Sequence, residues 1–387
     1  MKVLVVTYKA DISGGSNRAM LEVIDALIEQ NHEVNLIVPR KNGALYKEAE
    51  KRKIDCIYVP YTRVGIMRPQ GKLICLAEHL RMELKLLHDW LIAYKLKNNL
   101  KEKKYDIVYS NGSATHFGRI LSKQLGLPHV WHIREFFGID QLLPWRAYQR
   151  MNDRTDKYIV ISNAMRDIYE RKLGIDKVVM ISDGVPVPPE YCKKTHDGFR
   201  ILLAGRIAPA KLQLDAVKGF ETFRKMVNGA DVKLFLAGTP VTENDIKYKT
   251  EIDIYIKEKG LERDVVFLGQ VSDMAKLRAE MDIELMCSER EPFGRVTLEG
   301  MRAGLPVIGT ASGGTLDIIE ENVSGLFYQP GNTEELGKKI YQFYKNPEYL
   351  KKMSASAEQY GRTHFTEKQL LLVVELLEQT LKENKRG

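Results

Sequence analysis

The chain has 387 residues, more than a single hydrophobic core usually supports, so we expect two domains. A hydrophobic content of 44% with 28% charged residues is typical of a folded globular protein and excludes a mainly disordered chain. The formal charge of +8 favours an anionic partner, for which nucleic acid, a membrane surface and a phosphorylated small molecule all qualify.

The first half of the chain alternates predicted strands with predicted helices. It opens with a buried strand, KVLVVTY, followed by a loop that contains Gly14 and Gly15, a helix, and a second strand, HEVNLIVP. The alternation continues through KYDIVYSN, PHVWHI, KYIVIS and KVVMIS. The glycine loop stands where a phosphate loop would be, but the G-x-G-x-x-G pattern is absent, so a dinucleotide-binding fingerprint is not supported.

A long amphipathic helix is predicted over residues 72–104. Its apolar residues fall on one stripe at helical spacing: Leu73, Ala77, Leu80, Leu84, Leu87, Leu91 and Tyr94. One interpretation is that the helix covers the first sheet, and a second adds that its many basic residues rest on an anionic membrane. No stretch reaches the ~20 apolar residues of a membrane span, so we expect a protein of the cytoplasm, either free or peripheral on the inner face of the cell membrane.

A histidine stands at the end of the predicted strand PHVWHI. His132 follows an apolar run at the edge of the sheet where a ligand cleft would be. A lone histidine at such a place is more often a structural residue than a functional one, so both interpretations remain open on the residues alone.

A proline cluster divides the sequence. Pro186, Pro188 and Pro189 cannot continue a helix or a central strand, so we place a linker and the domain boundary near residues 186–198. The strand and helix pattern then begins again with FRILLAGRI, VKLFLAG, DVVFLGQ, DIELMCS and LPVIGT. The fold class is therefore α/β, with two parallel-sheet, Rossmann-like domains facing one another across a cleft, and ligands are expected at the carboxyl ends of the strands.

Basic residues follow the first strand of the second half. Arg206 and Lys211 lie in GRIAPAKLQ, and a guanidinium fork with a mobile ammonium suits a diphosphate. Taken alone, the pair could equally be a solvated loop pair.

The stretch EPFGRVTLEG aims two carboxylates toward one helix start. Gly294 lets the backbone approach a ligand, and the N–H groups of the helix that begins near Val296 favour an anion. Glu299 is placed to accept bonds from a vicinal diol such as a ribose, and Glu291 to bind a second polyhydroxyl group. The alternative is that both acids only stabilise a helix N-terminus. A further tight loop, ASGGT, follows the next strand.

These motifs resemble the retaining nucleotide-sugar glycosyltransferases of family 4 (glycosyl transferases group 1), which have the GT-B fold. The resemblance covers nearly the whole chain, and EPFGRVTLE carries the E-x7-E signature of that family. It implies an acceptor-binding domain over residues 1–187, a domain for the nucleotide sugar over 188–365, and a C-terminal helix over 366–387 that packs back on the first domain.

The resemblance also implies a role for each candidate residue. Glu299 would bind the ribose, while Arg206 and Lys211 would neutralise the departing diphosphate. His132, Glu291, Arg206 and Lys211 form the implied catalytic set, with Gly14, Gly15 and His132 near the acceptor. The implied donor-binding set is Gly205, Arg206, Lys211, Gln270, Val271, Glu291, Phe293, Gly294, Arg295, Val296 and Glu299.

The sequence departs from the family pattern at three positions. Leu212 replaces a glycine, Asp317 a longer acid and Asp183 an asparagine, and none of these changes removes a charge that the diphosphate needs. The DxD motif that would hold a metal is absent, so we expect no metal and no cofactor.

The expected function is a retaining, metal-independent transferase that moves a sugar, most simply from a UDP-sugar, to a carbohydrate or lipid-linked acceptor in surface polysaccharide or glycolipid synthesis. A nucleotide-sugar epimerase of the same fold and a non-catalytic nucleotide-sugar-binding protein are the alternatives. Nucleic acid is not an expected partner, because no basic stripe with interleaved aromatic residues is present.

Overall fold

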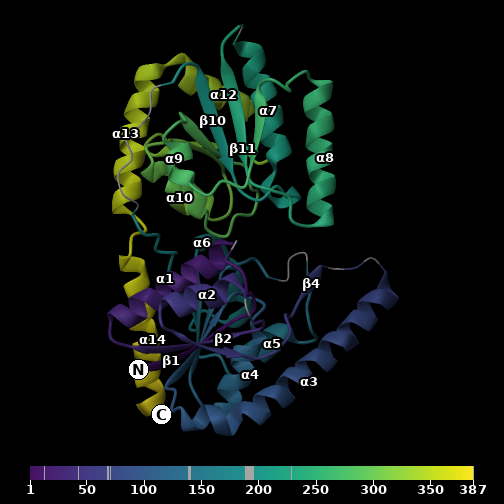
Figure 1. Ribbon diagram of the computed structural model, residues 1–387, viewed down its shortest axis with the longest axis vertical. Helices are drawn as coiled ribbons and strands as arrows, with labels where there is room; N and C mark the ends of the chain where they lie inside the picture. Colours follow the sequence, from purple (N-terminus) through teal and green to yellow (C-terminus); the bar gives the residue numbers. More distant parts are fainter. Residues whose placement is uncertain are drawn as a thin grey trace. The chain divides into compact units, whose positions relative to one another are not determined.

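The structure is a computed structural model that describes residues 1–12, 14–41, 43–67, 69, 71–137, 141–187, 196–227 and 229–386. By its internal contacts the chain divides into unit 1, Met1–Val185 with Glu367–Gly387, and unit 2, Pro186–Thr366. Each unit is built on a parallel sheet with helices on its faces (Figure 1). Pro188 and Pro189 of the predicted linker lie outside the described residues.

In the described part of unit 1, seven strands form a parallel sheet in the order β3-β2-β1-β5-β6-β8-β9. The strands are β1 (Lys2–Thr7), β2 (Glu33–Val38), β3 (Asp55–Tyr58), β5 (Ile107–Asn111), β6 (His129–Ile133), β8 (Lys157–Val160) and β9 (Val178–Met180). Continuous apolar runs such as that of β1 and β5 are buried on both faces, as is typical of parallel sheets. The strand order reverses between β1 and β5, which makes their carboxyl ends the topological switch point.

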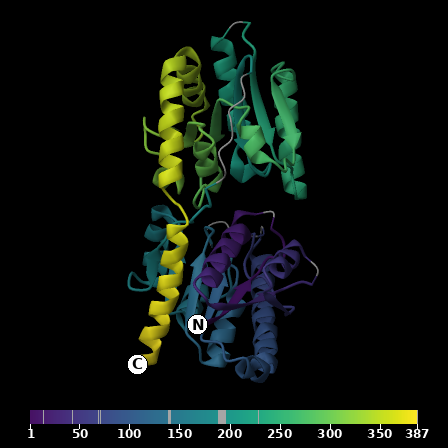
Figure 2. The same cartoon turned by 60° about the vertical axis from the view of Figure 1, so that its left-hand side comes forward.

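Helices cover both faces of this sheet. They are α1 (Gly15–Glu29), α2 (Ala44–Lys51), α3 (Lys72–Glu102), α4 (His116–Leu125), α5 (Ala147–Asn152), α6 (Asn163–Leu173) and α14 (Lys368–Arg386), and a short antiparallel pair joins β4 (Ile66–Met67) to β7 (Gln141–Leu142). Val3 and Val5 of β1 pack with α1 and α14, whereas Leu4 and Val6 pack with α3 and α4. The C-terminal helix α14 therefore belongs to unit 1 and lies along it (Figure 2).

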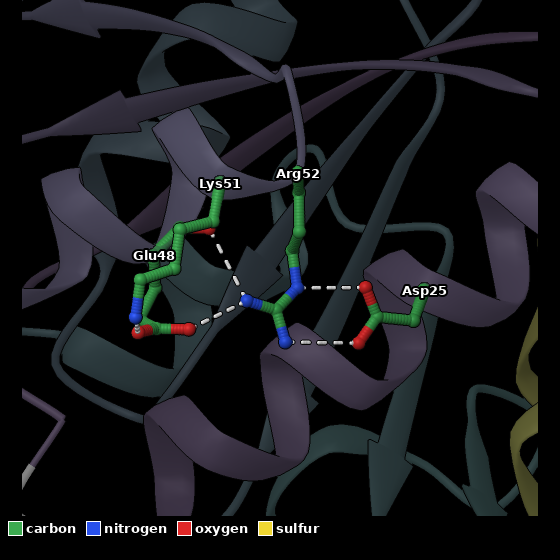
Figure 3. A network of polar contacts seen from close by, with 4 residues as sticks. All are labelled: Asp25, Glu48, Lys51 and Arg52. Carbon is green, nitrogen blue, oxygen red and sulfur yellow. Dashed lines mark hydrogen bonds and ion pairs between the residues drawn. The ribbon is translucent and has the colours of Figure 1, made fainter.

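A bidentate ion pair holds α2 against α1 (Figure 3). Arg52, which follows α2, donates from Nε to Asp25 Oδ1 at 2.7 Å and from Nη2 to Asp25 Oδ2 at 3.1 Å. Its Nη1 also donates to Glu48 Oε2 at 2.8 Å, and Glu48 Oε1 accepts from Lys51 at 2.6 Å. Hydrogen bonds from Lys51 and Arg52 lower the pKa of Glu48. The parallel fork makes this pair geometrically specific.

The long helix α3 forms as predicted, but the predicted apolar stripe is not its buried face. Met82, Leu86, Ala93 and Leu100 are buried instead, on another side of the helix. The stripe residues Leu73, Leu80, Leu84, Leu87, Leu91 and Tyr94 are exposed. Because both sides of the helix carry apolar residues at helical spacing, periodicity alone could not identify the inner one.

A buried carboxylate fixes the orientation of α3. Asp89 accepts hydrogen bonds from the backbone N–H and the Oγ1 of Thr62, at 3.1 and 2.9 Å. Burial raises the pKa of Asp89 to about 6. The inner side of the helix is thus set by one polar contact as well as by packing.

In the described part of unit 2, six parallel strands follow the order β12-β11-β10-β13-β14-β15. The strands are β10 (Phe199–Ala204), β11 (Val232–Ala237), β12 (Val265–Gly269), β13 (Ile283–Met286), β14 (Val307–Thr310) and β15 (Gly325–Tyr328). The helices are α7 (Gln213–Met226), α8 (Glu243–Glu258), α9 (Met274–Arg278), α10 (Arg295–Arg302), α11 (Thr315–Ile318), α12 (Thr333–Lys345) and α13 (Pro347–Thr363), with the 3-10 turn η1 (Pro209–Lys211). This is the doubly wound Rossmann order, with its switch point between β10 and β13.

Candidate active site

The two loops at the switch point of unit 2 are joined by an ion pair. Lys211, in η1 after β10, donates from Nζ to Glu291 Oε2 at 2.5 Å. Glu291 lies between β13 and α10 and is the more buried partner, with 14% of its side chain exposed against 33% for Lys211. The structure thus brings together two residues that lie far apart in the sequence, at the edge of the sheet where open α/β sheets bind ligands.

A buried glutamine shapes the loop after β10. Gln213 is fully buried, donates from Nε2 to Arg206 O at 2.9 Å and accepts from Ala208 N at 3.3 Å. Gly238 is also required, because a Cβ at that position would lie 1.9 Å from Gly205 O. Sequence reasoning missed Gln213, since a single glutamine beside a lysine carries no distinctive pattern.

Unlike Lys211, which pairs with Glu291, Arg206 lies near Asp245. Its Nε lies 3.8 Å from Asp245 Oδ2, and 52% of its side chain is exposed. Asp245 belongs to the capping box at the start of α8. Arg206 therefore keeps an exposed guanidinium on the same loop as Lys211, where it can reach an anion.

The loop that carries Glu291 is held by glycines of the next loop. Gly314 N donates to Glu291 O at 2.7 Å. A Cβ on Gly314 would lie 2.7 Å from Phe293 Cα, and one on Gly313 would lie 2.6 Å from Glu291 O. The predicted Gly-Gly turn is therefore a packing element that positions the loop before α10.

The N-terminus of α10 has no side-chain cap among the described residues. Gly294 precedes the helix with a φ of 105°. Phe293 is buried, whereas Val296 and Arg295 lie in the first turn. Uncapped backbone N–H groups and the positive end of the helix dipole favour an anion at this position.

Glu299 is oriented by a buried arginine that sequence reasoning missed. Arg278, at the end of α9, donates from Nη1 to Glu299 Oε2 at 3.0 Å and from Nε to Glu284 Oε2 at 2.9 Å. Burial opposes the charge of Arg278, but Glu284 and Glu299 raise the pKa of Arg278 above its ordinary value. Burial raises the pKa of Glu284. Arg278 thus fixes the orientation of the Glu299 carboxylate through Oε2.

Gln270 and Val271 directly follow β12. Gln270 is exposed, and Val271 packs against the small cluster that contains Leu202 and Ala237. The donor-binding residues predicted from the sequence thus all lie at the carboxyl ends of β10, β12 and β13 in one unit.

His132 lies in a buried polar network of unit 1. Its Nδ1 accepts from Arg134 Nη2 at 3.2 Å and lies 2.7 Å from the hydroxyl of Tyr109. Because a guanidinium can only donate, Nδ1 carries no proton and Nε2 is the N–H of the neutral ring. That Nε2 is buried and, among the described residues, has no hydrogen-bond partner. Burial, and then the charge of Arg134, hold the pKa of His132 well below its usual range.

The network extends to the glycine loop of unit 1. Arg134 donates to Asn111 Oδ1 at 2.7 Å, and Asn111 Nδ2 donates to Ser16 O at 3.3 Å. Gly14 precedes α1, which Gly15 begins, and no side chain of the described residues caps the helix. Hydrogen bonds therefore run from His132 through Arg134 and Asn111 to Ser16, the residue that follows Gly14 and Gly15.

The departure at Asp183 has a structural reason. Arg134 is buried and forms an ion pair with Asp183, whose carboxylate raises the pKa of Arg134 against the effect of burial. An asparagine would leave the guanidinium without this counter-charge, which would be costly in a buried site. The aspartate thus compensates the arginine beside His132.

Neither a metal cluster nor a membrane span is found among the described residues. No group of three or more histidine, cysteine, aspartate or glutamate side chains in that part of the chain could hold a metal ion. None of the helices described is both long and apolar enough to cross a membrane.

Two family models match the chain in succession. The model for Glycosyltransferase Family 4 matches residues 13–187, and the model for Glycosyl transferases group 1 matches residues 182–360. Together they span both units except for the chain ends.

Individual proteins also resemble the chain, either over part of its length or at low sequence identity over most of it. The N-acetyl-alpha-D-glucosaminyl L-malate synthase of Bacillus anthracis is 30% identical over 168 residues, which are 43% of this chain and 42% of that protein. The UDP-Gal:alpha-D-GlcNAc-diphosphoundecaprenol alpha-1,3-galactosyltransferase of Escherichia coli is 22% identical over 340 residues, 81% of either chain. Anabaena HepE, crystallised with UDP, has a TM-score of 0.79 at 20% identity, covering 98% of this chain and 100% of that one. This likeness confirms the predicted fold class of two Rossmann-like α/β domains.

Proposed function

Because the chain belongs to the glycosyltransferases of family 4 and group 1, we propose that it moves a sugar from a nucleoside-diphosphate sugar to a hydroxyl acceptor, with retention at the anomeric carbon. The observation that carries the proposal is the Lys211–Glu291 pair at the switch point of unit 2, beside the uncapped N-terminus of α10. Cation, carboxylate and helix N–H groups together suit a diphosphate joined to a polyhydroxyl group.

The leaving diphosphate is the group that most needs stabilisation. As the bond between the anomeric carbon and the diphosphate oxygen breaks, negative charge grows on that oxygen. Lys211, Arg206 and the N–H groups of α10 would stabilise this charge by preorganised electrostatics, and we propose that they do so without a metal. Glu291, which accepts from Lys211 in the structure, would turn to a hydroxyl of the donor sugar.

Retention is proposed to occur by displacement on the face that the diphosphate leaves. The acceptor oxygen forms its bond to the anomeric carbon while its proton passes to the departing phosphate oxygen, so no carboxylate nucleophile is required. His132 would donate its Nε2–H to a hydroxyl of the reacting sugar, because that buried donor has no partner among the described residues.

The substrates are proposed from the named partners of similar proteins. HepE was crystallised with UDP and with UDP-glucose, and the Escherichia coli relative is named for a UDP-sugar and a diphosphoundecaprenol acceptor. A UDP-sugar donor and a carbohydrate or lipid-linked acceptor of surface polysaccharide or glycolipid synthesis are therefore the first candidates.

The test is donor turnover. The protein is incubated with UDP-, GDP- and ADP-sugars, and release of the nucleoside diphosphate is followed with and without acceptors. Release accelerated by an acceptor supports the transferase. Epimerised donor without release would support an epimerase, and tight binding without either reaction would support a non-catalytic binding protein.

Replacing Glu299 with alanine is expected to weaken binding of the free nucleoside diphosphate by about 10- to 100-fold, since a hydrogen bond to a charged group contributes about 1.5–3 kcal/mol. Isothermal titration calorimetry measures the affinity. Glu334→Ala is the matched control, because Glu334 is an exposed acid of the same unit that forms an ion pair with Lys338. An unchanged affinity in Glu299→Ala would refute the ribose-binding role.

A further inference from the structure

The outer side of α3 carries an unusually apolar surface. We define the α3 stripe as Leu73, Leu76, Leu80, Leu84, Leu87, Trp90, Leu91 and Tyr94. All are exposed, Leu73 by 83% and Leu84 by 68%. The helix runs along the outer edge of unit 1 (Figure 1). A contiguous exposed apolar surface marks an interaction site, whereas single apolar residues scattered over a surface do not. The apolar residues of α3 are contiguous, because they line up along one side of the helix.

Basic residues border the α3 stripe. In residues 72–104 they are Lys72, Arg81, Lys85, Lys95, Lys97, Lys101, Lys103 and Lys104. The acids there are fewer, and three have contacts within the unit: Asp89 is buried, Glu83 accepts from Arg150 at 2.7 Å, and Glu78 lies 3.4 Å from Arg81. Lys85 also lines a cavity of about 460 Å³ with Arg63, so positive charge continues onto the neighbouring loop.

We propose that the α3 stripe lies in the interface of an anionic lipid bilayer. An apolar helix face bordered by lysines suits the boundary between acyl chains and anionic headgroups, because long basic side chains can extend from the apolar layer to the headgroups. Trp90 and Tyr94, which stack at 5.7 Å, are residue types enriched at that depth. Trp145 adds a further exposed aromatic side chain in the same unit.

Charge favours a membrane over a second copy of the chain. Two α3 stripes packed together would place basic borders against basic borders in either helix direction, and like charges along paired helices repel. An anionic surface instead attracts each basic residue by about 1 kcal/mol, or about fivefold in affinity. The inference does not depend on the proposed transferase function, because membrane binding needs neither donor nor acceptor.

The experiment is vesicle co-sedimentation of the full chain. We expect it to bind vesicles of phosphatidylglycerol mixed with phosphatidylcholine at least tenfold more tightly than vesicles of phosphatidylcholine alone, and less tightly at high salt. Leu84→Glu with Leu87→Glu should lose at least tenfold in affinity, since burying one leucine contributes about 1.5–3 kcal/mol. Leu371→Glu with Leu372→Glu is the matched control, because these leucines are exposed on α14 of the same unit.

A spectroscopic readout identifies the surface that binds. Trp90 is exposed and Trp131 fully buried, so binding should shift the emission of Trp90 to the blue, and the shift should shrink in Trp90→Phe. Equal binding by the stripe variant and the wild type would overturn the proposal. The proposal would also be overturned if the wild type did not bind anionic vesicles but formed a dimer that Leu84→Glu dissociates. The partner of the α3 stripe would then be a second copy of the chain.

Discussion

Replacing Lys211 with alanine is expected to lower kcat/KM for the sugar donor by about 10²–10³, the usual loss when one preorganised donor to a developing oxyanion is removed. Lys211 donates to Glu291 at 2.5 Å, and it lies on the loop that follows β10 at the switch point. Its ammonium would move from Glu291 to the diphosphate when the donor binds. The loss should fall mainly on kcat, because the charge on the leaving oxygen is greatest in the transition state.

The comparison separates catalysis from folding. Lys211→Arg keeps the positive charge and should retain more activity than the alanine variant. Lys338→Ala removes an exposed lysine of the same unit that pairs with Glu334, and it should behave as the wild type. Steady-state kinetics and a thermal unfolding scan are recorded for each variant. Activity within threefold of the wild type in Lys211→Ala would contradict the role, whatever its unfolding temperature.

Much of this site could be predicted because its parts are local in the sequence. The order of strands and helices gives two doubly wound sheets, and in such sheets the residues after β10 and β13 must meet at one edge. The meeting of Lys211 with Glu291 follows from that topology, as does the place of the Gly313-Gly314 turn between β14 and α11. The E-x7-E spacing then indicates which carboxylates share the edge.

The residues that were missed act through contacts distant in the sequence. Arg278 orients Glu299 from the end of α9, and Gln213 holds the loop of Arg206 from the start of α7. Neither belongs to a pattern, because their partners depend on how separate elements pack. The buried side of α3 was predicted wrongly for a related reason. Both sides of the helix carry apolar residues, and tertiary contacts such as that of Asp89 with Thr62 decide which side is buried.

The interior of unit 1 predicts a second large effect, on stability at acid pH. His116 and His129 are fully buried and burial lowers the pKa of each to about 3, while burial and Arg134 lower the pKa of His132. Histidines that must stay neutral when folded contribute stability above the unfolded pKa of about 6.5, and lose it as the pH falls toward the folded pKa. Asp89, whose pKa is raised to about 6, opposes this trend over part of the range.

Lowering the pH from 7 to 5 should therefore reduce the free energy of unfolding of unit 1 by roughly 4–6 kcal/mol, since each of the three histidines loses about 2 kcal/mol and Asp89 returns about 1 kcal/mol. Urea unfolding followed by tryptophan emission measures this unit alone, because Trp90, Trp131 and Trp145 are the three tryptophans of the chain and all lie in unit 1.

One variant isolates a single titrating group. The ring of His116 contacts Trp131 edge-on at 4.9 Å and also packs near Phe137, and neither ring nitrogen has a hydrogen-bond partner among the described residues. Phenylalanine should fit there, so His116→Phe should make the dependence of unfolding free energy on pH shallower by about one proton. His364→Phe, which changes an exposed ring of unit 2, should leave the tryptophan-reported dependence unaltered. If wild type and His116→Phe lost stability in parallel between pH 7 and 5, the acid sensitivity would have to come from groups other than this buried histidine.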